Sequence, residues 1–155
     1  MIVKPSSCPY IMAMEHTIRI VDAATVKPAI KLWLRNTSFS QYGDLKQLGT
    51  SFWRCSVGDQ YMHQLYIIRK GTEGSLYTFI MDLEQGPEVD EQGLITGQVM
   101  AASPWNAVWD WFRTKKIAID CSPCFPEAFD LGMWHLYFSA GERCGFCRIF
   151  LTAIH

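Results

Sequence analysis

Short runs in which hydrophobic and polar residues alternate are the clearest pattern in this chain, and they predict strands. The first run covers residues 16–22, and the residues after Thr25, a favourable N-cap, have helical spacing. The apolar stripe of this predicted helix consists of Val26, Ile30, Trp33 and Leu34. Residues 51–83 predict a three-stranded meander, and Gly58-Asp59 predicts the tight turn of its first hairpin.

A second helix is predicted after Ser103, another favourable N-cap, with Pro104 at the first helical position. Its apolar stripe consists of Trp105, Val108, Trp109 and Phe112, which leaves Trp111 beside the stripe. The polar residues 84–97 before this helix predict a surface loop. The runs after it predict a strand over residues 116–120, a helical turn over 126–130, and a final hairpin over 133–139 and 145–154.

Strands outnumber helices in this order, and neighbouring strands share short turns. The sequence therefore predicts an α+β fold: a mainly antiparallel sheet, formed by the meander and the C-terminal hairpin, packed with two principal helices. No repeat is recognised, and a length of 155 residues is typical of one domain. Prolines interrupt the first residues, and we expect an N-terminal extension over residues 1–13 and a single α+β domain over residues 14–155.

Composition adds a surplus of aromatic residues, which form 14% of the chain and include six Trp. More rings than a core requires favour an apolar pocket or a partner surface. In the predicted hairpins, His63 lies opposite Arg54 among aromatic neighbours, and His135 shares a strand face with Tyr137. The candidate ligand or partner surface consists of Trp53, Tyr61, His63, Trp111, His135 and Tyr137.

Charge and targeting patterns narrow the classes of partner. Fourteen basic and fifteen acidic residues leave a net charge of −1, so nucleic acid is not an expected partner. No apolar stretch reaches the roughly 20 residues that span a bilayer, and no export signal is recognised, so we expect no membrane partner and a cytoplasmic location. Six cysteines in such a chain indicate thiols or metal ligands rather than disulfides.

Two Cys-x-x-Cys pairs allow three interpretations. Cys121, Cys124, Cys144 and Cys147 have a spacing that can surround a zinc ion. A final hairpin that turns at Gly141-Glu142 would instead pair Ser139 with Cys144 and Leu136 with Cys147. The sulfurs of Cys144 and Cys147 would then point to opposite faces of the hairpin, and the four cysteines would be plain thiols. Redox chemistry at Cys121 is disfavoured by Asp120 beside it. No cofactor is favoured, and zinc is the alternative.

The absence of a recognised catalytic motif favours a non-enzymatic binding or interaction protein. Its partner would be a small apolar ligand or a protein, including a second copy of the chain in a homodimer or other homo-oligomer. The alternatives are a zinc-stabilised interaction domain and a small enzyme. The predicted order of elements resembles that of the GNAT family of acetyltransferases in topology, which implies acyl transfer, although Gln92–Gly97 departs from the family's pyrophosphate-binding loop.

Overall fold

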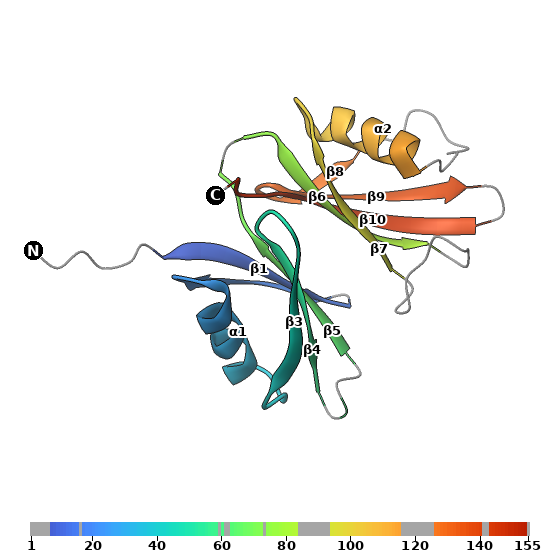
Figure 1. Ribbon diagram of the computed structural model, residues 1–155. Helices are drawn as coiled ribbons and strands as arrows, with labels where there is room; N and C mark the ends of the chain where they lie inside the picture. Colours follow the sequence, from blue (N-terminus) through green and yellow to red (C-terminus); the bar gives the residue numbers. More distant parts are fainter. Residues whose placement is uncertain are drawn as a thin grey trace, which may run out of the picture. The chain divides into compact units, whose positions relative to one another are not determined.

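The computed structural model describes residues 7–15, 17–58, 60, 63–72, 74–83, 94–115, 126–140 and 143–154. It divides the chain into two compact units, an N-terminal unit over Met1–Lys70 and a C-terminal unit over Gly71–Ile154. Among the described residues, each unit has one antiparallel five-stranded sheet and one helix (Figure 1). The prediction of an α+β fold with mainly antiparallel strands is therefore confirmed.

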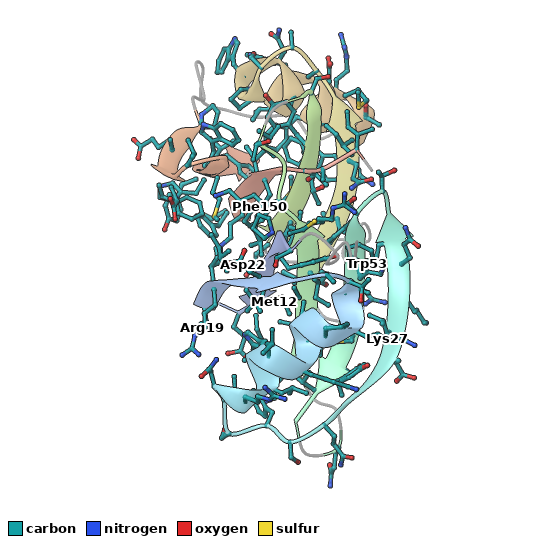
Figure 2. The ribbon with its side chains drawn as sticks, turned by 90° about the vertical axis from the view of Figure 1, so that its left-hand side faces the viewer. Met12, Arg19, Asp22, Lys27, Trp53 and Phe150 are labelled. Atoms are coloured by element: carbon teal, nitrogen blue, oxygen red, sulfur yellow. The ribbon has the colours of Figure 1, made fainter. Side chains whose placement is uncertain are left out.

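The N-terminal unit has the strand order β2-β1-β5-β4-β3. Its elements are β1 (Cys8–Met14), β2 (Thr17–Ala23), α1 (Val26–Arg35), β3 (Tyr42–Gly49), β4 (Phe52–Val57) and β5 (His63–Arg69). Helix α1 covers one face of the sheet, because Ala29, Ile30 and Trp33 are buried against it. Met12 on β1 belongs to this core, whereas Lys27 lies on the exposed side of α1 (Figure 2).

The C-terminal unit has the strand order β7-β6-β10-β9-β8. Its elements are β6 (Leu76–Leu83), β7 (Leu94–Met100), α2 (Pro104–Lys115), β8 (Glu127–Asp130), β9 (Met133–Ala140) and β10 (Arg143–Leu151). The Oγ of Ser103 caps α2 by accepting a hydrogen bond from the N–H of Asn106 at 3.1 Å, as its sequence predicts. The helix buries Val108, Trp111 and Phe112 against one face of the sheet.

The two units repeat one topology, and the repeat extends to individual residues. In each, a two-stranded hairpin and a helix precede three strands, and the last strand pairs with the first. Residues 21–35 and 99–113 carry the same amino acid at six positions: Val21/Val99, Ala23/Ala101, Ala24/Ala102, Ala29/Ala107, Trp33/Trp111 and Arg35/Arg113. This repeat was not predicted from the sequence, because its matched segments lie at different spacings in the two units.

A ring contact is repeated at equivalent positions of the two sheets. Tyr10 lies 6.1 Å from Trp53 in the N-terminal unit, and Tyr77 lies 5.7 Å from Trp134 in the C-terminal unit, measured between ring centroids. Both tyrosines are buried, and this burial raises the pKa of each phenol. The same aromatic pair thus closes the same part of both helix-covered cores.

The predicted meander differs from the observed pairing. Strand β5 has β1 on one side and β4 on the other, so that no edge of it remains for β6, which begins the second sheet. Residues 8–13 of the predicted extension lie in β1, an inner strand, and the chain forms two units where one domain over residues 14–155 was predicted. The predicted loop over residues 84–97 overlaps the first four residues of β7, and the predicted helical turn contains β8. The predicted strand 116–120 lies outside the described residues.

The first hairpin shows why its predicted faces were wrong. A two-residue turn at Gly58-Asp59 would pair Val57 with Gln60, whereas Val57 pairs with His63. Gly58 and Gln60 have positive φ angles of 92° and 60°, which open a wider loop. A shift by an odd number of residues moves a strand's side chains to the other face. His63 therefore lies on the face covered by α1, and Arg54 lies on the other.

Candidate functional site

The face of the C-terminal sheet that points away from α2, here called the far face, carries side chains in rows across the strands. In an antiparallel sheet, directly paired residues lie side by side on one face. One row contains Asp82, Phe146 and Tyr137 from β6, β10 and β9. The next row contains Arg148 from β10, with His135 from β9 and Glu127 from β8. All six of these side chains are aromatic or charged.

Four rings form a continuous cluster on the far face. The ring of His135 stacks on Phe129 with a centroid distance of 5.2 Å and an interplanar angle of 11°, and it lies 5.9 Å from Phe146. Phe146 in turn lies 4.6 Å from Tyr137. Tyr137 is 73% exposed and Phe129 is 40% exposed. We call Phe129, His135, Tyr137 and Phe146 the aromatic patch.

Charged groups lie within the aromatic patch and at its edge. The guanidinium carbon of Arg148 lies 5.3 Å from the ring centroid of Phe146, a cation–π distance. Burial lowers the pKa of Arg148, while Tyr137 and Asp82 raise it, and the group remains a cation at neutral pH. Glu127 Oε2 lies 3.6 Å from His135 Nε2, and its side chain is 81% exposed.

Two of the six residues predicted for a ligand or partner surface, His135 and Tyr137, therefore lie together. The other members of the aromatic patch, Phe129 and Phe146, were missed. The alternation of Phe146 and Arg148 along β10 with the buried Cys147 and Ile149 was the signal that could have found one of them. Phe129 was hidden because its segment was predicted to be helical.

Two predicted surface tryptophans contribute to the cores. Trp111 is 2% exposed, and its ring stacks on Phe79 with a centroid distance of 4.8 Å. The apolar stripe predicted for α2 is therefore rotated by part of a turn from the face that the helix buries. No described residue accepts a hydrogen bond from its Nε1. Trp109, predicted to be core, is 44% exposed. Trp53 is half-buried against Tyr10 on the helix-covered side of the N-terminal sheet.

His63 belongs to the N-terminal unit and has a different environment from the one predicted. Its Nδ1 lies 2.9 Å from Glu15 Oε1, and its ring lies 5.3 Å from Phe39. The Glu15 side chain is 64% exposed, so this contact contributes little to stability. Tyr61, the remaining predicted surface residue, lies outside the described residues.

The final hairpin has the register that places its cysteines on opposite faces. Ser139 pairs with Cys144 and Leu136 pairs with Cys147. Cys147 is buried in the helix-covered core, where burial raises the pKa of its thiol, and Cys144 is exposed on the far face. These two sulfurs do not point toward one ion. Cys121 and Cys124 lie outside the described residues, so a zinc site that includes them stays a prediction.

Formal charge is divided unevenly between the two units. Residues 1–70 contain nine Lys or Arg and four Asp or Glu, whereas residues 71–154 contain five and eleven. The net charge of −1 therefore combines +5 for the N-terminal unit with −6 for the C-terminal unit. The aromatic patch belongs to the acidic unit.

Comparison with known proteins adds no relative: no family model, no curated protein and no solved structure matches this chain. Helices α1 and α2, the two described helices, have 10 and 12 residues and are too short to cross a bilayer.

Proposed function

We propose that this chain is a protein-interaction module that binds another protein through the aromatic patch. The observation that carries the proposal is the exposure of Tyr137 and Phe129 within a cluster of four touching rings. Aromatic side chains with an adjacent arginine are enriched at the energetically dominant centres of protein interfaces. An exposed aromatic cluster of this kind is a liability in water unless a partner uses it.

Rigidity also supports a docking role. The rings of the aromatic patch project from β8, β9 and β10, which are paired strands and not loops. A bulge in the pairing between Ala128 and Asp130 accompanies the stacking of Phe129 on His135. Because the rings hold one another in place, a partner that binds them would restrict few additional rotamers.

Site-specific photocrosslinking in the native cell tests the proposal. A benzophenone amino acid replaces Tyr137 in one variant and Trp109 in the matched control, which is also exposed and aromatic but lies on α2. We expect discrete protein adducts from position 137 that position 109 does not form. An adduct of twice the chain mass of 17.7 kDa would identify a second copy as the partner. Identical adducts from both positions, or none from position 137, would contradict the proposal.

A further inference from the structure

Carboxylates surround the aromatic patch. Asp82 is paired directly with Phe146, and Glu127 is paired directly with His135. Asp130 ends β8 opposite Met133, and its Oδ1 accepts a hydrogen bond from the N–H of Leu131 at 2.7 Å. Arg148 supplies one positive charge against these three carboxylates. The described part of this surface is therefore negative, in agreement with the net charge of −6 of residues 71–154.

The rings themselves attract cations. A cation over an aromatic face is stabilised by the ring quadrupole, and the Arg148 guanidinium already occupies such a position over Phe146. The two most exposed rings of the patch, Phe129 and Tyr137, lie on either side of His135 in contact with it. Exposed ring faces next to exposed carboxylates offer an incoming cation both a cation–π contact and an ion pair.

Resting on the proposed function, we propose that the partner of the aromatic patch is a basic protein. A Lys or Arg side chain of this partner lies against the exposed rings of Phe129 and Tyr137 and pairs with the carboxylate of Glu127. The negative C-terminal unit attracts such a partner during encounter and repels nucleic acid, which would bring further negative charge to the three carboxylates. Of the partners that could cover these rings, a basic protein is therefore the one whose charge is complementary to this surface.

A nuclear magnetic resonance titration of the full chain with defined probes tests this inference. The probes are the capped tripeptides Arg-Leu-Arg, Gln-Leu-Gln and Glu-Leu-Glu, which share one apolar residue and differ in charge, and a hexathymidylate. The readout is the shift of the Tyr137 and His135 ring resonances. We expect Arg-Leu-Arg to shift them with the highest affinity. Glu127→Gln and Asp82→Asn should each weaken its binding about three- to fivefold, the size of an exposed cation–π or ion-pair contribution.

Asp110→Asn is the matched control, because it makes the same charge change on α2, where Asp110 pairs with Arg113; it should leave binding of Arg-Leu-Arg unchanged. Equal binding of Gln-Leu-Gln, lost in Tyr137→Ser, would overturn the basic partner while supporting the proposed function. Preferential binding of hexathymidylate to the patch would overturn the inference in favour of nucleic acid. If none of the probes shifts the patch resonances, the inference fails and the photocrosslinking decides the proposed function alone.

Discussion

Each of the two units has its own helix-covered core, and the two cores are built from equivalent positions. The units differ in the side chains on the sheet face that points away from the helix. On the helix-covered faces, equivalent positions hold the same residue or a close substitute, as in Trp33 and Trp111. The ring pair Tyr137 and Phe146 lies on the far face of the C-terminal sheet, and it corresponds to Ser56 and Gln64 on the far face of the N-terminal sheet, which is the face that points away from α1. Gln64 Nε2 donates a hydrogen bond to Ser56 Oγ at 3.2 Å, so a polar pair replaces an aromatic one.

The charged positions of the far faces diverge in the same way. Glu127 and His135 of the C-terminal unit correspond to Lys46 and Arg54 of the N-terminal unit, which are paired on β3 and β4. One topology therefore carries a basic polar surface in one unit and an acidic aromatic surface in the other. Because Lys46, Arg54, Glu127 and His135 are at least partly exposed, these positions can change without loss of the fold, and their difference points to interaction and not to stability.

The largest effect is expected from removing the same core side chain in each unit. Ile67 and Ile149 occupy equivalent places on the inner strands β5 and β10, and both are fully buried. Ile67→Ala and Ile149→Ala should each lower the free energy of unfolding by about 2–5 kcal/mol, through lost burial and the cavity left behind. Hydrogen exchange should show the loss of protection mainly in the unit that carries the substitution. Equal loss across both units would break the comparison, because it would mean that one cooperative body unfolds.

An intermediate effect is expected at Gly97 on β7. A Cβ built there would overlap Cζ3 of Trp111, so Gly97→Ala forces the indole away from Phe79. We expect a loss of about 1–3 kcal/mol in the free energy of unfolding, measured by chemical denaturation. The equivalent residue of the N-terminal unit is Arg19, whose Nη1 donates a hydrogen bond to Asn36 O at 3.0 Å. Arg19→Ala is the control and should cost about 0.5 kcal/mol or less; a larger loss than at Gly97 would contradict the packing difference.

The sequence was sufficient to predict elements whose pattern is strong and local. The helices begin directly after Thr25 and Ser103, as these two capping residues predict, although no side-chain hydrogen bond caps α1. The pairing of Leu136 with Cys147 was predicted because that register gathers the apolar residues of β9 and β10 on one face. Local pattern thus fixes a hairpin when its turn is short.

What could not be predicted depends on partners that are distant in sequence. Among the described strands, β3, β7 and β8 lie at sheet edges and each buries at most one residue, so their sequences show little alternation of apolar and polar positions. Strand β1 is an inner strand because it pairs with β5, some fifty residues later in the chain. No local pattern in the sequence predicts a pairing between strands so far apart. For the same reason the aromatic patch was predicted only in part: Phe129 joins His135 through the pairing of β8 with β9.

The smallest effect is expected at alkaline pH, where the units can be compared through one buried thiol each. Cys55 pairs with Leu65 in the N-terminal unit, and Leu136 pairs with Cys147 in the C-terminal unit, so the same two residue types exchange strands. Burial raises the pKa of Cys55 from its ordinary value of 9.0 to about 12 and also raises the pKa of Cys147.

In the folded chain both buried thiols keep their protons, whereas in the unfolded chain they lose them above about pH 9. Alkali therefore favours the unfolded state, and the stability that is present below pH 9 is lost as the pH rises. At pH 10 each thiol should lower the free energy of unfolding by about 1.4 kcal/mol relative to pH 7. Cys55→Ala and Cys147→Ala should each remove the contribution of one thiol, which is about half of the loss that the two buried thiols cause together. Urea denaturation at both pH values measures this loss. Cys144→Ala, which removes an exposed thiol, should not alter it. If only one of the two substitutions changes the pH dependence of the free energy of unfolding, the two cores do not exclude water equally. The two units would then be equivalent in their backbone topology but not in the packing of their cores.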